Sequence, residues 1–534
     1  MGTLNLALAG IDPTNPIPGV YSEVRYAQGE SAGDLGPKKI LIIAPKTAAG
    51  LLTPDTQVFG PISDENDFIN QCGQGSPAHR MGKRFLSLCK SALLYVICPT
   101  AATGTASVDK VTVTFSSGSN PSAAGVAIVT IAGVDCPFAY TTSDTVSTIA
   151  AGLATAVNNK PDLPVTASAA LGVVTITAKV TGEEMNTFRY RTTVTANTLT
   201  ILAPAADTFF GLSAQAGAAQ GTGTISYTAA LSTILPSKYS YLVAHYSCAW
   251  SGGVPVPGTS VPIGALSTQI TTQALPITGF KQKAIYGSAM SSSNATTLAA
   301  TLNNPRCQQV NLNQCQEEHY MLAATMAATR VNNELANPVF NYDFYGVQAG
   351  QVFPIKAPFN TSAWPATADY LLTLNNGVAQ LGVNDAGQVY IVRSVTTRAK
   401  DGFGNYDYRA RDTAVVTTGD KFTDDGSVKL AQGPWSLITD DPLDSNQKQP
   451  PLQFATPKRL KAYLETLVRL YVDNGWFDPS RLTTILSAMQ VGIDPVVSSR
   501  MNISIPAYTA VALHQQALLI KESSPPVLSA PDAR

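Results

Sequence analysis

The sequence predicts a multidomain α+β protein with a mixed α/β core, an inserted β-rich module and extended arms at both chain ends. Three observations lead to this prediction. Strand-like and helix-like segments alternate before residue 100, short alternating strands rich in Thr, Ala and Val fill residues 101–222, and single strand-like segments stand alone near both termini. Alternating strands and helices are typical of a mixed core, whereas clustered short strands are typical of a separate β-rich unit.

Length and charge bound the possible functions. The chain has 534 residues, enough for roughly three or four domains. Only 13% of the residues are charged, about half the usual share of roughly 25%, and 35 basic residues against 36 acidic ones leave a net charge of −1. Copies of such a chain repel one another weakly, which favours self-association. Nucleic acid is not an expected partner, because it requires a basic stripe.

Residues 1–36 form the predicted N-terminal arm, since they are rich in Gly, Pro, Asn and Ser. Within them Val20, Val24 and Tyr26 fall on one face of a period-two pattern, and Tyr21 falls on the other face. This pattern predicts one strand behind a turn. No partner strand lies nearby in the sequence, so these four residues are the candidate inter-subunit strand of this arm. The first residues lack the basic segment of a secretory signal, so we expect a protein made in the cytoplasm.

Residues 37–100 and 223–440 form the predicted α/β core. The nearly continuous apolar run at residues 39–45 predicts a strand that is buried on both faces. A helix over 77–92 and a second buried strand over 93–98 complete the first strand–helix–strand unit. After the module the core continues with strands at 239–244, 283–287 and 389–393 and with helices at 317–333 and 363–381.

Residues 101–222 are predicted to be a peripheral β-rich module that the core fold does not need. Alternating runs recur at 111–115, 127–131 and 173–178, and one amphipathic helix from Thr145 to Asn158 interrupts them.

Residues 441–522 form a predicted C-terminal domain, and residues 523–534 a disordered tail. Thr456 and Pro457 begin a helix that Asn474 and Gly475 end. Residues 501–505 alternate, and a last strand is predicted over 513–521. The candidate C-terminal arm positions are Leu513, Leu518 and Ile520, and the basic positions on the exposed side of the helix are Lys458, Arg459, Lys461 and Arg469.

The residues give little sign of catalysis, so no enzyme, cofactor or metal is predicted. The seven cysteines contain no CxxC pair and are expected to be buried thiols. The four histidines lack ligand spacing, and no phosphate-binding loop is present. The GxSxG match at 29–33 is followed by residues 34–37, which break helices, so a flexible linker is favoured over a nucleophile elbow. The acidic pairs Asp424–Asp425 and Asp440–Asp441 are interpreted as turns, and no apolar stretch reaches the roughly 18 residues of a membrane span.

Four stretches together resemble the contractile tail sheath family in its Mu-like branch. Residues 18–21 resemble its early Pro-Gly-Val-Tyr strand, and residues 126–190 resemble its inserted module. Residues 393–412 resemble the segment with paired threonines and a later glycine and aspartate. Residues 424–426, followed by the helix that starts at Thr456, resemble its C-terminal domain. The resemblance covers most of the chain, in the family's order, although residues 434–451 and the tail after Glu522 depart from the pattern.

The resemblance implies a structural subunit of the virion tail. Subunits would stack in rings around a tail tube protein, contract irreversibly without nucleotide, and drive the tube through the host envelope. Arms from both chain ends would add strands to sheets of neighbouring copies. The implied partners are further copies of the chain, the tail tube protein, and the baseplate and tail terminator proteins, without membrane insertion. In the family the C-terminal domain lies on the tube side, which makes Lys458, Arg459, Lys461 and Arg469 candidate tube contacts.

Two other functions stay open from the residues alone. A surface adhesin would explain the β-rich module but predicts a secretion signal. A carbohydrate-active enzyme with an accessory β module predicts a cleft with paired carboxylates.

Overall fold

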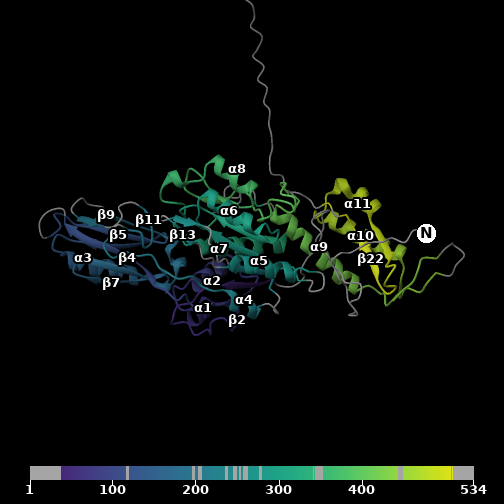
Figure 1. Cartoon of the computed structure of the whole chain (residues 1–534), viewed down its shortest axis with the longest axis horizontal. Helices are drawn as coiled ribbons and strands as arrows, with labels where there is room; N and C mark the ends of the chain where they lie inside the picture. The colour runs from purple at the N-terminus through teal and green to yellow at the C-terminus, as the bar shows by residue number, and fades with distance from the viewer. Residues whose placement is uncertain are drawn as a thin grey trace, which may run out of the picture.

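The computed structural model describes residues 38–506 and 508, apart from 116–119, 195–198, 203–206, 214, 235–238, 245–248, 252–253, 257–261, 276–279, 341, 343–352, 408 and 443–448. A β-rich module, a mixed α/β core and a smaller C-terminal unit follow one another along the longest axis of the molecule (Figure 1). The predicted mixed α/β fold class with several sheets is confirmed. The arms and the domain boundaries stay predictions.

The core is built on one eight-stranded sheet in the order β18-β17-β16-β15-β12-β1-β3-β2. Its six inner strands run parallel, and the edge strands β2 and β18 are antiparallel to their neighbours. Parallel sheets need helices on both faces, and the core provides them. The strands are β1 (Lys39–Ile43), β2 (Val58–Ile62), β3 (Leu93–Ile97), β12 (Tyr241–Ala244), β15 (Lys283–Ser288), β16 (Cys307–Asn311), β17 (Ala379–Val383) and β18 (Val389–Ile391).

Strand β1 explains why the sequence at this point is apolar without alternation. Ile40 and Ile42 face one hydrophobic cluster, with α1, α2 and α7, while Leu41 and Ile43 face a second cluster on the other side of the sheet, with α4, α5 and α6. Both faces of the strand are therefore buried, as predicted. The helices are α1 (Glu65–Cys72), α2 (Pro77–Leu88), α4 (Thr228–Ile234), α5 (Pro262–Gln273), α6 (Ser292–Leu302) and α7 (His319–Ala336).

The module consists of two four-stranded antiparallel sheets around one cluster with α3. Its two links to the core lie side by side, because the Thr105 amide donates to Thr222 Oγ1 and the Thr222 amide donates to the Thr105 carbonyl. Adjacent entry and exit points are what an insertion requires. The elements are β4 (Ala106–Phe115), β5 (Gly125–Ile131), β6 (Val134–Tyr140), α3 (Val146–Asn158), β7 (Val165–Ala170), β8 (Val173–Thr181), η1 (Glu183–Asn186), β9 (Arg189–Val194), β10 (Leu199–Leu202) and β11 (Thr208–Phe209).

Helix α9 (Thr413–Ala431) connects the core with the C-terminal unit (Figure 1). Phe422 of α9 packs in the C-terminal cluster with Leu464 and Tyr471 of α10, so this cluster includes residues before 441. The remaining elements are β13 (Ala249–Ser251), β14 (Val254–Val256), η2 (Thr361–Ala363), α8 (Thr367–Asn375), β19 (Leu437–Ile438), β20 (Phe454–Ala455), α10 (Pro457–Asp473), η3 (Pro479–Arg481), α11 (Leu482–Ala488), β21 (Gln490–Ile493) and β22 (Met501–Ser504).

Three sequence-based predictions need correction. The helix expected over 363–381 ends as α8 at Asn375, because Gly377 takes a left-handed conformation (φ +80°) and β17 follows. The helix expected to reach residue 92 ends at Leu88. The turn expected at Asp424–Asp425 is wrong, since both residues lie inside α9.

A buried carboxylate, Glu334 of α7, connects four parts of the core. Its oxygens pair with Lys38 Nζ at 3.2 Å and Arg330 Nη2 at 2.7 Å. They also accept from the hydroxyls of Tyr241 and, at 3.1 Å, Thr417. Burial alone would raise the pKa of Glu334, but the charges of Arg330, Lys38 and Lys283 hold it well below its usual range.

Glu334→Gln tests this carboxylate. The substitution leaves Arg330 and Lys38 as buried charges without a counter-ion, so we expect the free energy of unfolding to fall by about 3–5 kcal/mol at neutral pH. Urea unfolding followed by fluorescence measures the change, with Asp385→Asn at an exposed carboxylate as control. Because the folded-state pKa lies below the ordinary 4.5, the contribution is full above that pH and is lost as the pH falls through the lower folded value. A variant as stable as the control would contradict the role.

Candidate functional site

The predicted arm strands cannot be placed. Val20, Tyr21, Val24, Tyr26, Leu513, Leu518 and Ile520 all lie outside the described residues. The GxSxG match at 29–33 lies there as well, and so do His245, His514 and Cys248. The six described cysteines are free and buried, as predicted.

The predicted basic helix is α10, and its first turn has the expected cap. The hydroxyl of Thr456 accepts from the amide of Arg459, and Pro457 occupies the first helical position. Leu460, Leu464, Leu467, Val468 and Tyr471 are buried against the C-terminal cluster. The apolar face of the helix is therefore used within the chain.

Three of the four basic candidates lie along one stripe of α10. Lys458, Lys461 and Arg469 are spaced by three and eight residues, which places them on the same helical face with Glu465 between them. Lys458 and Arg469 are exposed, and Lys461 is half-buried. The stripe therefore presents three cations and one carboxylate.

Arg459 has a different role. Its guanidinium donates to the carbonyls of Pro450 at 2.9 Å, Pro451 at 2.9 Å and Phe454 at 2.6 Å. These bonds hold the segment before α10 against the helix. Arg459 is consequently occupied within the chain, and this local role could not be predicted from its charge.

Next to α10, β21 and β22 form a two-stranded antiparallel ribbon. Among the described residues neither strand pairs with a third one. The buried Asp494 holds the ribbon by accepting from Arg500 Nε at 3.0 Å and Asn502 Nδ2 at 2.8 Å. Burial opposes the charge of Asp494, but these hydrogen bonds keep its pKa well below the usual range. The loop that joins the strands is thus fixed, and within the described ranges no third strand extends either edge of the ribbon.

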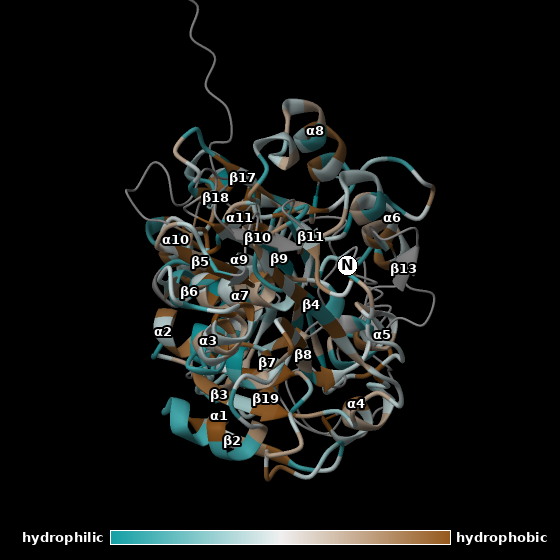
Figure 2. Cartoon of the chain, turned by 90° about the vertical axis from the view of Figure 1, so that its left-hand side faces the viewer, coloured by the Kyte–Doolittle hydropathy of each residue, from teal (hydrophilic) through white to brown (hydrophobic). Residues whose placement is uncertain are grey.

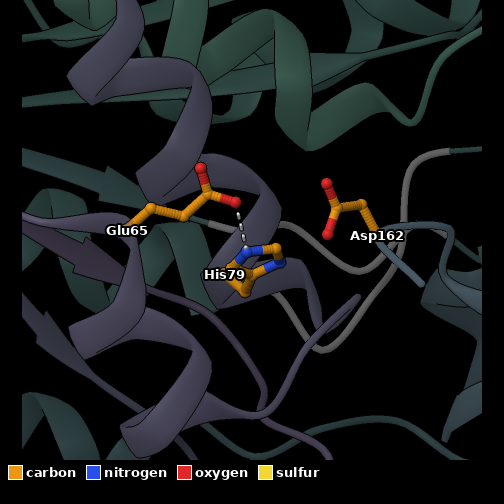
Figure 3. A group of neighbouring side chains, drawn as sticks. All are labelled: Glu65, His79 and Asp162. Atoms are coloured by element: carbon orange, nitrogen blue, oxygen red, sulfur yellow. Dashed lines mark hydrogen bonds and ion pairs between the residues drawn. The ribbon is translucent and has the colours of Figure 1, made fainter. Parts of the chain in front are cut away.

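A polar cluster lies where the module meets the core. Glu65 of α1, His79 of α2 and Asp162 of the module point toward one another (Figure 3), with their ligand-type atoms within 4.8 Å. Lys83 Nζ lies between the two carboxylates, at 2.7 Å from Glu65 and 2.5 Å from Asp162. The cluster already contains its own cation.

The cluster does not fit a metal ion. The Gly75 amide donates to His79 Nδ1 at 3.1 Å, so this nitrogen is the acceptor and the ring proton lies on Nε2, 3.3 Å from Glu65. Neither nitrogen then offers a lone pair to a metal. Burial lowers the pKa of His79, which keeps the ring neutral. The arrangement is a structural junction.

Two sets of contacts hold the module to the core. At the first, Asp162 also accepts from Gln74 Nε2 at 2.8 Å, and Arg80 Nη1 donates to the Asp162 carbonyl at 2.9 Å. The second set lies around β9 and the β5–β6 turn. The Arg189 amide donates to the Gln316 carbonyl at 3.1 Å, and Thr187 Oγ1 lies 2.8 Å from His319 Nδ1. Lys356 Nζ donates to the Gly133 carbonyl, and the guanidinium of Arg191 lies over the Phe359 ring, 3.7 Å from its centre. Contacts at two separate places fix the orientation of the module.

Sequence reasoning missed this junction. The histidines of the sequence show no ligand spacing, whereas in the structure His79 and His319 are buried and their partners come from remote segments. No local pattern in the sequence points to Asp162 or Thr187. In the described part of the chain, no helix combines the length and the apolar character needed to cross a bilayer.

Comparisons with known proteins add structural likenesses only. No protein-family model matches the sequence, and no curated protein matches it. The chain is similar to the sheath tail protein of Desulfitobacterium hafniense, with 12% identity, a TM-score of 0.43, and coverage of 91% of this chain and 99% of that one. It is similar to a sheath tail protein of Listeria innocua, with 13% identity, a TM-score of 0.42 and coverage of 90% and 94%. A sheath complex of an extracellular contractile injection system in the contracted state gives 8% identity, a TM-score of 0.41 and coverage of 96% and 99%.

Proposed function

We propose that the chain is the structural subunit of a contractile tail sheath, which polymerises around an inner tube and contracts to drive the tube through a host envelope. The observation that carries the proposal is the β21–β22 ribbon. A two-stranded ribbon is marginal by itself, and open strand edges recruit further strands. The chain has strand-forming sequences at both ends, at 20–26 and 513–521, without a partner nearby in the sequence.

The arms and the ribbon form one polymerisation device in this proposal. Val20, Val24 and Tyr26 of one copy, or Leu513, Leu518 and Ile520 of another, extend the ribbon of a neighbour. Each added strand satisfies backbone groups that an isolated strand leaves unpaired. Because the arm is joined to its own core at Lys38, copies remain connected while the cores change their relative positions.

The proposed partners follow from the resemblance, which points to the Mu-like branch. They are further copies of the chain, the tail tube protein, and the baseplate and tail terminator proteins, in the virion tail. A low share of charged residues, 13%, favours such self-association over nucleic-acid binding. The role is structural, without catalysis, cofactor or membrane insertion.

The proposed tube contact is the stripe Lys458, Lys461 and Arg469 on α10. Arg459 is left out because its guanidinium binds three carbonyls of its own chain. Exposed charges interact weakly one at a time, but a polymer repeats them in every ring. Contacts of this kind can break as a sheath widens while the strand pairing persists.

Removal of residues 1–27 tests the polymerisation device. The truncated chain keeps every described element, so we expect unchanged circular dichroism and thermal midpoint. Assembly should be lost, because each ribbon then lacks one added strand. Sedimentation through a cushion measures the assembled fraction, and full-length chain in the same buffer is the control. Truncated chain that pellets as efficiently as the full-length chain would contradict the arm mechanism.

Charge reversal tests the tube contact. Lys458→Glu, Lys461→Glu and Arg469→Glu together should weaken co-sedimentation with purified inner tubes at low salt. Raising the salt should reduce the difference from wild type, since the screening length is about 8 Å at physiological ionic strength and shorter above it. The matched control reverses Lys90, Lys110 and Lys160, three basic residues that lie outside the C-terminal unit. Equal binding by both triple variants at low salt would exclude the α10 stripe.

A further inference from the structure

The loop 398–407 presents an aromatic side chain to solvent on a rigid support. Phe403 at its tip is 93% exposed. Asp401 Oδ1 accepts from the amides of Phe403 and Asn405, both at 2.9 Å, and the Asp401 amide donates to the Asn405 carbonyl at 2.8 Å. The tip is therefore closed on itself, and the ring of Phe403 is left outside.

The base of the loop is fixed as firmly as its tip. Asn303, the C-cap of α6, accepts from the amides of Ala399 and Lys400 and donates to the Lys400 carbonyl at 2.8 Å. Asp407 pairs with Arg398 at 3.0 Å and Arg409 at 2.9 Å. Burial opposes the charge of Asp407, but these partners lower its pKa to about 2. A side chain held out in this way loses little conformational entropy when a partner binds it.

An apolar helix face is available elsewhere on the same chain. Helix α8 buries only Thr373, while Leu371 is 62% and Leu372 43% exposed. Ala368 is exposed on the same face, one turn earlier. In both views α8 lies at the rim of the molecule (Figures 1 and 2). The face is thus open in the described part of a single copy.

The loop does not contact α8 within a single copy. Phe403 is 93% exposed and Leu371 of α8 is 62% exposed, so neither side chain covers the other. The base of the loop is held by Asn303 and its tip by Asp401, which keeps Phe403 in this position. A contact between Phe403 and α8 therefore joins two copies.

The charges around the two surfaces are complementary. Residues 394–411, which include the loop, contain four basic residues against two acidic ones, Asp401 and Asp407. Residues 357–392, which include α8, contain Asp369 and Asp385 and no Lys or Arg. Lys400 and Asp385 are both exposed, so they can meet at the rim of a contact. Opposite charges orient two copies as they approach.

From these observations we propose that Phe403 of one copy docks on the Ala368–Leu371–Leu372 face of α8 in a second copy, with Lys400 facing Asp385. The two surfaces differ, so the contact is heterologous and propagates into rings or helical polymers instead of closing a symmetric dimer. This inference rests on the proposed function, which supplies the polymer. One buried aromatic side chain contributes about 150–250 Å², less than the roughly 1,200 Å² of a stable interface. The contact therefore acts together with strand exchange.

Phe403→Ser is the direct test, with Leu171→Ser as the matched control. Leu171 lies at the β7–β8 turn, is 95% exposed and has no place in the proposed contact. Both variants should fold as wild type, because neither side chain packs in its own chain. Phe403→Ser should raise the critical concentration for polymerisation about tenfold or more, since burial of one Phe side chain corresponds to at least that factor. Leu171→Ser should leave it unchanged.

Two further measurements identify the receiving surface. In polymers assembled from mixed Phe403→Cys and Leu371→Cys chains, mild oxidation by a copper–phenanthroline complex should give a band at twice the monomer mass. Each variant alone should not give this band. Lys400→Glu and Asp385→Lys should each weaken assembly, and their combination should restore it.

The outcomes separate the inference from the proposed function. The docking contact would be overturned, and the sheath proposal left intact, if the wild-type chain polymerises but mixed Phe403→Cys and Leu371→Cys polymers give no cross-link and Phe403→Ser assembles normally. A wild-type chain that forms no polymer under any condition would overturn the sheath proposal, and the docking contact with it.

Discussion

The buried carboxylate of Glu334 is the constraint on which the relative placement of the core elements depends. It joins the start of β1 through Lys38, the neighbouring strand β12 through Tyr241, and α9 through Thr417, while Arg330 of its own helix neutralises it. A buried charge is tolerated only when its partners are in place. The start of β1, which follows the predicted N-terminal arm, and the helix that leads to the C-terminal unit are therefore fixed by one group.

The same logic holds about one turn further along α9. Asp420 accepts hydrogen bonds from both Nη groups of Arg306, and Lys283 pairs with it at 2.9 Å. Further along, Phe422 enters the C-terminal cluster, and Asp425 accepts from the hydroxyl of Tyr471. The module is held to the core at two separate places, around Asp162 and around β9. Each junction uses charged or hydrogen-bonded groups that cost free energy if only one side is present, which favours parts that move together as one body.

The sequence predicted what depends on local pattern. The continuous apolar run of β1, the cap at Thr456 and the alternation of β8 are local signals, and each element formed where it was expected. It missed what depends on distant partners. Helix α9 buries Thr417, Thr418 and Asp420, which is unfavourable until Arg306, Lys283 and Glu334 surround them. Arg459 looked like a free surface cation, but its partners are carbonyls that only the folded segment before α10 brings near it. The arm strands stay predictions.

In the proposed function, this chain polymerises by itself through surfaces that each subunit carries. Electron microscopy of the purified full-length chain, at a series of concentrations and with nothing added, tests it most directly. Hollow tubes or stacked rings are expected above a threshold concentration, with a wall one subunit thick. A uniform field of single particles with the dimensions of one chain at every concentration would contradict it.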